Sequence, residues 1–583
     1  MRDDRFPRRR GHRHVSRSLT AGDVTVTVAS DIGQPARMSL ATSSDSFWEL
    51  ANGPLFEVRI SGRRMAPENI VTTSISSLDG VLIGTYGIGN ELELRLACRS
   101  EPSGALGIEM QVRLSSDAQP TDIVLTLPLL MESSAKLAMA PQTPAGRPVV
   151  RSTTFPMPEA ITGRRGWLAI LCAYPSINPD SSNEEPTTWH PVPARFSVRA
   201  RSDWVDVCRL VLVACQPSWL AVFLAMRVEL RSRLDLSQYD RSDLKWCSDQ
   251  WVQHLAFVYG SEVFDHSRQV MDPTRLLEGS RRFGAYDATL IWSGYPRLGI
   301  DERSQWDMYD DLPGGRSGLR SLAEFLRQQN TRVFFPFLPW EGLPGFGCRE
   351  TIGPVAQLAR LVADVRPDGI FLDTVGGILP EYREAIDDVC AGVVFCSEED
   401  PAPPEIELVT TSWDQARHDH RCEVDLLRFL VPEHRRFVTS RYSTGAHREN
   451  VIDRALFNGN GLVVWQDIFG EMLPYSDHEA TRVAEVAATL RSHADTFRGA
   501  DALPLVPTAQ EGLFANAFIG SAGAALITVC NVNDSPVRGD LVAWTPDDRL
   551  IWRRVNSVDT KPSVFPRGEL GPDEVAVFVG SQK

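Results

Sequence analysis

The sequence is short of lysine, of paired cysteines and of long apolar segments. Lysine occurs only at positions 136, 245, 561 and 583, so arginine supplies nearly all the positive charge. No apolar run approaches the ~20 residues that a membrane helix requires. The net charge of −15 disfavours nucleic acid and anionic membranes as partners. The overall composition, 43% hydrophobic and 23% charged, is typical of a soluble globular protein.

The ten cysteines are scattered, and no two form a Cys-x-x-Cys pair. This spacing excludes a zinc framework and a dense disulfide scaffold. We therefore expect reduced thiols and a cytoplasmic location. Residues 1–18 are basic and predicted to be disordered. Their triple arginine is similar to a twin-arginine export signal, but no apolar segment follows it, which makes export the less favoured alternative.

Hydrophobic patterning divides the remaining chain into three regions. Residues 19–235 alternate polar and apolar in short runs, which is typical of a large β-sandwich. Residues 236–498 alternate apolar runs with helical patterns, which predicts a (β/α)8 barrel. Residues 499–583 return to a β pattern and predict a small β-sandwich. The predicted fold class is therefore α/β plus all-β, with a central TIM barrel between two β-sandwiches.

The eight predicted barrel strands are 254–260, 287–294, 331–340, 368–373, 391–398, 405–413, 435–443 and 461–470. The sixth unit is the weakest, because the helix after residue 413 is poorly patterned.

Carboxylates end two neighbouring predicted strands, at the edge where barrel enzymes carry their active sites. Asp373 ends the fourth strand, and Glu398 with Glu399 ends the fifth. Because side chains alternate along a strand, Phe371 and Asp373 share a face, as do Cys396 and Glu398. Cys396 is small enough for a crowded barrel interior, so parity predicts Glu398 inward and Glu399 outward. A kink at the strand end would reverse this assignment.

Two carboxylates at adjacent strand ends are what the cleavage of a glycosidic bond requires. In a retaining glycosidase, one attacks the anomeric carbon while the other protonates the leaving oxygen, and the two lie roughly 5–5.5 Å apart. We assign Asp373 as nucleophile and Glu398 as acid/base. The alternative for Asp373 is a loop aspartate that caps a backbone amide before Gly376 and Gly377.

Indoles and charged groups gather at the other predicted strand ends and in the loop 295–318. Indole faces stack on sugar C–H surfaces, while carboxylates and arginine bind hydroxyl groups, so the set predicts a carbohydrate pocket. The alternatives are ordinary packing for the tryptophans and a solvated acidic loop. The predicted substrate-binding residues are Trp292, Trp306, Asp307, Trp340, Glu341, Glu399, Arg441, Trp465 and Asp467. Trp413 with Asp414 and Tyr442 also follow predicted strands.

Metal and serine chemistry have little support. His418-Asp419-His420 and His12-Arg13-His14 have the spacing of metal ligands, but neither lies on the first barrel strand. No Gly-x-Ser-x-Gly elbow occurs. We expect no metal and no cofactor.

The barrel resembles bacterial α-glycosidases of the α-galactosidase-like families, and most nearly the endo-α-N-acetylgalactosaminidases. In those enzymes an aspartate nucleophile ends strand four and a glutamate ends strand five. FLD at 371–373 and SEE at 397–399 match these positions, and residues 299–337 are similar to the strand-two loop, helix and strand three. The resemblance implies a retaining α-glycosidase. Residues Glu399 and Asp400 depart from the family, which usually has a tryptophan or a small residue after the acid/base.

The sequence thus predicts a retaining glycoside hydrolase that acts on an α-linked sugar, with a small carbohydrate or glycoside as its partner. Two alternatives stay open: a non-catalytic carbohydrate-binding protein, and a metal-dependent barrel hydrolase or lyase. The sugar, the linkage and the oligomeric state, a homo-oligomer included, stay open as well.

Overall fold

The chain divides into two compact units, Met1–Ala140 with Pro156–Ser232 and Pro141–Phe155 with Arg233–Lys583. The computed structural model describes residues 14–31, 37–42, 46–49, 57–60, 63–64, 70–88, 92–114, 122–127, 136–137, 141–151, 157–162, 167–173, 194–199, 204–294, 303–342, 353–415, 420–440, 444–499, 501–520, 523–556 and 562–582. No helix in these described ranges is long and apolar enough to cross a membrane.

The first unit consists of antiparallel sheets followed by one helix, as the alternating pattern predicts. Its sheets have the orders β12-β14-β15-β17-β10-β9-β8-β7, β16-β11-β5-β6 and β1-β2-β3-β4. In β9, Leu92, Leu94 and Leu96 are buried while the residues between them are not, so one face of the sheet forms the core. Helix α1 (Trp219–Arg231) begins where the Ser218 hydroxyl accepts a hydrogen bond from the Ala221 amide.

The strands of this unit are β1 (His14–Ala21), β2 (Val24–Asp31), β3 (Arg37–Thr42), β4 (Ser46–Glu49), β5 (Glu57–Ile60), β6 (Arg63–Arg64), β7 (Ile70–Leu78), β8 (Val81–Ile88), β9 (Leu92–Ser100), β10 (Leu106–Leu114), β11 (Asp122–Leu127), β12 (Lys136–Leu137), β14 (Glu159–Thr162), β15 (Trp167–Ala173), β16 (Ala194–Arg199) and β17 (Val205–Cys215).

The second unit contains the predicted barrel, which is closed and has eight parallel strands. They are β18 (Val252–Phe257), β21 (Ala288–Trp292), β22 (Arg332–Phe337), β23 (Gly369–Leu372), β24 (Val394–Ser397), β25 (Thr411–Asp414), β27 (Arg435–Thr439) and β28 (Gly461–Trp465). One buried cluster takes residues from all eight strands, among them Phe371, Cys396, Trp413 and Trp465. This cluster fills the barrel, which is therefore a packed core and not a pore.

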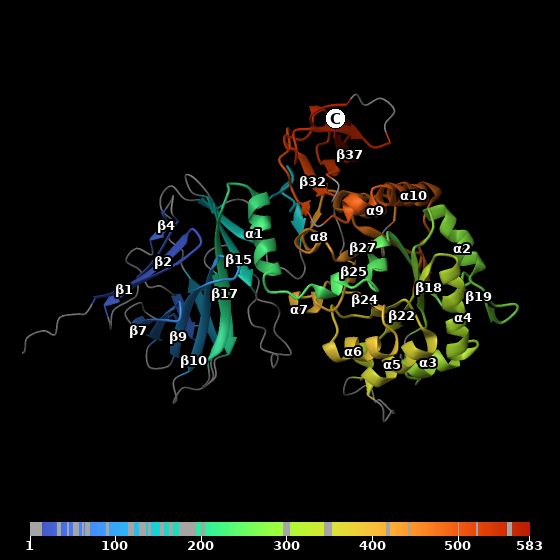
Figure 1. Cartoon of the computed structure of the whole chain (residues 1–583), viewed down its shortest axis with the longest axis horizontal. Coiled ribbons are helices and arrows are strands. Elements are labelled where there is room, and N and C mark those ends of the chain that lie inside the picture. Colours follow the sequence, from blue (N-terminus) through green and yellow to red (C-terminus); the bar gives the residue numbers. More distant parts are fainter. Residues whose placement is uncertain are drawn as a thin grey trace, which may run out of the picture. The chain divides into compact units, whose positions relative to one another are not determined.

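Helices surround the barrel, and α4, α5 and α6 lie side by side along its outside (Figure 1). The helices of this unit are α2 (Thr274–Ser280), α3 (Gln305–Asp311), α4 (Gly315–Gln328), α5 (Pro354–Val365), α6 (Pro380–Val389), α7 (Pro403–Ile406), α8 (Leu426–Leu430), α9 (Ala446–Asn458), α10 (Asp477–Ser492) and α11 (Ala494–Phe497). Single 3-10 turns are η2 (Ser237–Asp240), η3 (Lys245–Asp249), η4 (Arg281–Phe283) and η5 (Pro339–Gly342).

The sixth barrel strand is shorter than predicted. Residues 405–413 were expected to form it, but β25 covers only Thr411–Asp414 and Pro403–Ile406 form helix α7. Prolines at the start of a helix are favoured because their missing amide is not needed there. The Glu405 carboxylate also accepts a hydrogen bond from the Ala402 amide at 2.6 Å. Ile406 is fully buried, so the apolar residues that suggested a strand form the buried side of a helical turn.

The C-terminal residues form a five-stranded antiparallel sheet in the order β31-β32-β33-β37-β35 and a two-stranded sheet, β34-β36. The strands are β31 (Asp501–Leu503), β32 (Leu513–Ile519), β33 (Ala525–Asn531), β34 (Val537–Asp540), β35 (Leu550–Arg554), β36 (Arg567–Leu570) and β37 (Val575–Gln582). Short strands also decorate the barrel: β13 (Val150–Arg151), β19 (Phe264–Asp265), β20 (Val270–Met271), β26 (Val424–Asp425), β29 (Asp467–Ile468) and β30 (Glu471–Met472).

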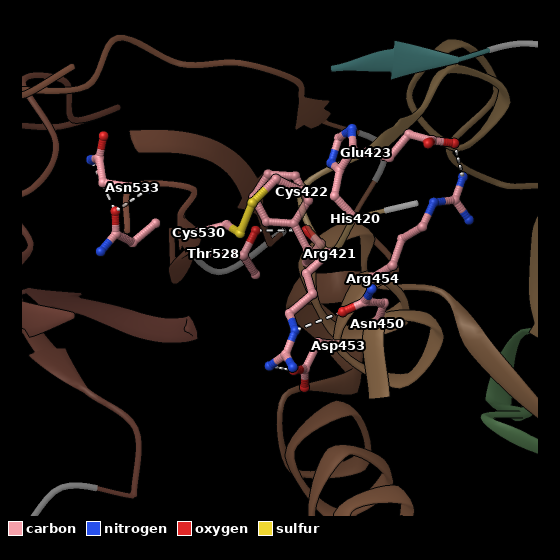
Figure 2. Close-up of a disulfide and its surroundings, with 12 residues drawn as sticks. His420, Arg421, Cys422, Glu423, Asn450, Asp453, Arg454, Thr528, Cys530 and Asn533 are labelled. Atoms are coloured by element: carbon pink, nitrogen blue, oxygen red, sulfur yellow. Dashed lines mark hydrogen bonds and ion pairs between the residues drawn. A yellow bond between two sulfur atoms is a disulfide. The ribbon is translucent and has the colours of Figure 1, made fainter. Parts of the chain in front are cut away.

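A disulfide joins the barrel to the C-terminal sheet. Cys422, in the segment after β25, is bonded to Cys530 of β33, with 5.8 Å between the Cα atoms (Figure 2). The expectation that all the thiols are reduced is therefore wrong for this pair. The sequence offered no sign of it, because the two cysteines are 108 residues apart and are brought together only by packing of the sheet on the barrel.

Candidate active site

Strand pairing places the two predicted catalytic carboxylates side by side. In the register of β23 and β24, Leu372 lies opposite Ser397, so Asp373 and Glu398 are the next residues of the two strands. The ladder continues past this pair, because the Glu398 amide donates to the Leu372 carbonyl at 3.1 Å. Both carboxylates therefore leave the carboxyl ends of neighbouring strands, where barrel enzymes carry their chemistry.

Asp373 is buried, with 2% of its surface exposed. Its amide donates to the Phe337 carbonyl at 3.0 Å, which fixes its backbone against the neighbouring strand β22. Its Oδ2 accepts a hydrogen bond from the Trp340 indole nitrogen at 2.7 Å. A hydrogen bond to an ionised carboxylate is charge-assisted, and it stabilises the charged form of Asp373.

Glu398 is half-buried, and two described residues donate hydrogen bonds to it. Its Oε2 accepts a hydrogen bond from the Thr374 amide at 2.8 Å, and its Oε1 accepts one from the side chain of Gln415. Thr374 directly follows Asp373 and has a left-handed backbone with φ 58°, which is uncommon for a threonine. This turn connects the two carboxylates through a single residue. Backbone strain of this kind occurs often at functional sites.

Parity along β24 is as the sequence predicts. Val394 and Cys396 belong to the cluster inside the barrel, so Glu398 continues the inward face. Glu399 is exposed and is the next residue along the chain, so by alternation it belongs to the opposite face. Its amide donates to the Val375 carbonyl at 3.3 Å.

The predicted set of indoles divides into a packed group and one indole beside the carboxylates. Trp292 is 3% exposed, Trp306 5% and Trp465 3%. Their rings lie against protein rings: Trp292 near Phe371, Trp306 near Phe337 and Trp465 near Trp413, with centroids 6.0–6.2 Å apart. The structure thus gives these three the packing role, while Trp340 is half-buried and contacts Asp373.

The other predicted charged residues bind backbone amides. Both oxygens of Glu341 accept from the Gln305 amide at 3.0 Å, which satisfies a free donor at the start of α3. Asp307 accepts from the Ser304 amide and hydroxyl at 2.8 Å in a capping box. Asp467 accepts from the Gly470 amide at 2.7 Å. Arg441 and Tyr442 lie outside the described residues.

Asp414 points away from the barrel axis. Trp413 takes the inward position, and its indole donates to the Gln253 side chain at 2.6 Å. Asp414 pairs instead with Arg454 of α9 at 2.7 Å and with Arg436 of β27 at 3.5 Å. It belongs to a buried ionic cluster that supports the strand ends from outside.

Arg436 is the centre of this ionic cluster. It also pairs with Asp425 at 3.0 Å and with Asp400, two residues after Glu398. Burial acts to raise the pKa of Asp425, but the charges of Arg436 and Arg454 outweigh it and hold the pKa below its usual range. Asp400, which follows the carboxylate pair in sequence, therefore has a structural partner.

The sequence did not predict Gln415 and Thr374 as partners of Glu398. Gln415 follows the sixth barrel strand, where the prediction considered only Trp413 and Asp414. Thr374 contributes its backbone amide, which every residue except proline has, so its residue type gives no indication of this contact. Within the described ranges, no three His, Cys, Asp or Glu side chains are grouped to hold a metal ion. Of the two His-x-His motifs, the residues His12, His418 and Asp419 lie outside those ranges, as does the side chain of His14.

No family model and no curated protein match this sequence. Solved structures do match it, and they define a class: the chain has an α-galactosidase-like glycosidase fold. The galactosidase domain of an α-galactosidase–sucrose kinase superposes with a TM-score of 0.55 at 10% identity, covering 97% of this chain and 99% of that chain.

Two further structures are similar over most of their length. A GH36 α-galactosidase from Geobacillus stearothermophilus, in complex with 1-deoxygalactonojirimycin, has a TM-score of 0.52 at 9% identity, covering 97% of this chain and 100% of that chain. An α-N-acetylgalactosaminidase from Bifidobacterium bifidum, in a GalNAc complex, has a TM-score of 0.54 at 13% identity, covering 88% of this chain and 98% of that chain. The predicted fold class, a TIM barrel preceded and followed in sequence by antiparallel β-sheets, is confirmed.

Proposed function

We propose that this protein is a retaining glycoside hydrolase that cleaves an α-linked sugar, with Asp373 as nucleophile and Glu398 as acid/base. The observation that carries the proposal is the placement of the two carboxylates on adjacent strand ends, tied together by the hydrogen bond from the Thr374 amide to Glu398. In this role Asp373 attacks the anomeric carbon as Glu398 protonates the leaving oxygen, and Glu398 then deprotonates the water that releases the sugar.

The surroundings suit these two roles. The hydrogen bond from the Trp340 indole stabilises the charge of the Asp373 carboxylate. Glu398 is less buried, as a group that exchanges protons with solvent water in the second step needs to be. For the sugar, α-galactosides and α-N-acetylgalactosaminides are the first candidates, because similar structures bear those activities in their names.

The test is hydrolysis of a panel of aryl α- and β-glycosides by the wild type and by Asp373→Asn. We expect release of one α-linked sugar by the wild type and a loss of at least about 10⁴-fold in Asp373→Asn, with an unchanged circular dichroism spectrum. Asp388→Asn, an exposed carboxylate of α6, is the control. Turnover that persists in a folded Asp373→Asn variant would remove the nucleophile assignment. Binding of sugar without turnover by the wild type or by any variant would instead favour the carbohydrate-binding alternative.

A further inference from the structure

A buried arginine at the opposite end of the barrel forms no ion pair with a carboxylate that the structure describes. Arg435, the first residue of β27, is 2% exposed. Its Nη2 donates to the Gln250 carbonyl at 2.9 Å, and its guanidinium lies 4.1 Å from the centroid of the Trp251 ring. The buried Nε has no hydrogen-bond partner among the described residues, and no described carboxylate forms an ion pair with this side chain.

Several other buried arginines of the barrel form ion pairs with carboxylates. Arg436 meets Asp425 at 3.0 Å, and Arg454 meets Asp414 at 2.7 Å. Taking a cation out of water without a counter-ion costs several kcal/mol, and burial lowers the pKa of Arg435 to about 9. A counter-ion from solution would offset this cost.

Arg435 lines a cavity of about 210 Å³. The cavity has two further cations in its lining, Lys245 and Arg498, and a single carboxylate, Glu433. Arg498 pairs with Asp249 and Asp495, whereas Lys245 has no ion pair with any residue that the structure describes. The electrostatic balance of the lining is therefore positive.

Ser248 and Thr410 also line the cavity. Thr410 directly precedes β25 and Arg435 begins β27, so the cavity lies at the amino ends of the barrel strands. The proposed catalytic carboxylates lie at the carboxyl ends. The two sites are thus separate, and the cavity has no part in the proposed chemistry.

We propose that this cavity binds one small oxyanion, such as inorganic phosphate, sulfate or a short carboxylate, between the Arg435 guanidinium and the Lys245 ammonium. Guanidinium and ammonium groups are the usual partners of such anions. The bound ion supplies the direct ionic partner that no described carboxylate provides for Arg435. Since it binds the folded state, it also stabilises this unit of the protein.

The test is isothermal titration calorimetry of the full chain with sodium phosphate, sulfate and acetate in separate arms, at constant ionic strength set with chloride. We expect saturable binding of one ion, and a melting temperature that rises with the anion that binds. Arg435→Met is expected to abolish binding and Lys245→Ala to weaken it about tenfold, the loss of one charge-assisted hydrogen bond. Arg320→Ala, on the exposed side of α4, is the matched control and should bind as the wild type does.

The comparison of the three arms identifies which oxyanion the cavity takes. Absence of saturable binding in all arms would overturn the proposal, as would equal binding by wild type and Lys245→Ala. The surface variant Lys245→Ala decides the question if Arg435→Met does not fold.

Discussion

At the level of single residues, the two proposed catalytic roles depend on what surrounds each carboxylate and not on the carboxylates alone. Asp373 and Glu398 differ in burial and in their hydrogen-bond partners, and these differences separate the proposed nucleophile from the proposed acid. Glu399 is the natural comparison, because it is adjacent in sequence, identical in chemistry and exposed.

Glu398→Gln should therefore slow hydrolysis of substrates with poor leaving groups by about 10²–10⁴-fold, and should affect activated aryl glycosides much less in the first step. Added azide should restore turnover and give a glycosyl azide of retained configuration, because azide needs no general base. Glu399→Gln should behave as the wild type in the same assays. An equal loss in both variants would contradict the assignment of Glu398 alone as acid/base. A loss with azide rescue in Glu399→Gln only would transfer that role to Glu399.

Trp340→Phe tests the indole hydrogen bond to Asp373. Removing one hydrogen bond to a charged group costs about 1.5–3 kcal/mol, so kcat/KM should fall by roughly 10–100-fold while the ring volume is nearly kept. Trp246→Phe is the control, since its indole donates to the Gly392 carbonyl at 3.1 Å outside the site. A loss of the same size in the control would show that the effect is one of stability.

At the scale of elements, the sequence predicted all eight barrel strands, because strands buried on both faces are continuous apolar runs bounded by turns. It also predicted that Cys396 faces the barrel interior, because side chains alternate along a strand and cysteine is small enough for that crowded space. The sixth unit was misjudged at its start, where the Pro403 turn buries Ile406 as a helix does. Trp292 and Trp465 were predicted to bind substrate, but they end their strands and pack inward in the barrel core. A sequence does not distinguish an indole that faces a ligand from one that faces another ring.

His434 joins two barrel elements and gives a prediction on acid stability. Its Nε2 lies 2.8 Å from the Ser412 hydroxyl of β25, and its Nδ1 lies 2.9 Å from the hydroxyl of Tyr239. Burial lowers the pKa of His434 from 6.5 to about 3, with Arg436 adding to the effect. The unfolded chain therefore binds a proton between these values that the folded protein does not.

Acidification from pH 6.5 toward 3 should consequently destabilise the wild type, by an amount on the order of 4 kcal/mol from this group. His434→Gln keeps one polar partner and should show a flatter decline of the urea midpoint over the same pH range. His266→Gln, an exposed histidine, is the control and should follow the wild type. An equally steep decline in His434→Gln would mean that carboxylates alone cause the loss of stability at low pH.

At the scale of the whole molecule, the fold class was within reach of the sequence and the long-range link was not. Cys422 and Cys530 are 108 residues apart, and neither lies in a spacing motif, so only the packing of the C-terminal sheet on the barrel reveals their pairing. The same holds for β13, which belongs to the barrel unit through its pairing with β26 although it lies among the N-terminal strands in sequence.

Removal of the disulfide tests this link. The double variant Cys422→Ser with Cys530→Ser should lose about 2–4 kcal/mol of stability, because a closed loop of this length restricts the unfolded chain. The wild type with reductant should lose as much, and Cys390→Ser, which removes an unpaired thiol, should lose much less. Thiol titration of the denatured wild type should find two fewer thiols without reductant than with it. Equal counts would show that the pair is reduced in the protein as isolated.

The most direct test of the central claim is covalent trapping of the nucleophile. The wild type is incubated with mechanism-based inhibitors of α-galacto, α-N-acetylgalactosamino and α-gluco configuration, and then analysed by intact mass and peptide mapping. We expect a single glycosyl adduct on the peptide that contains Asp373, and no adduct in Asp373→Asn. An adduct on another carboxylate, or turnover of the matching substrate with inversion and no adduct, would contradict the claim.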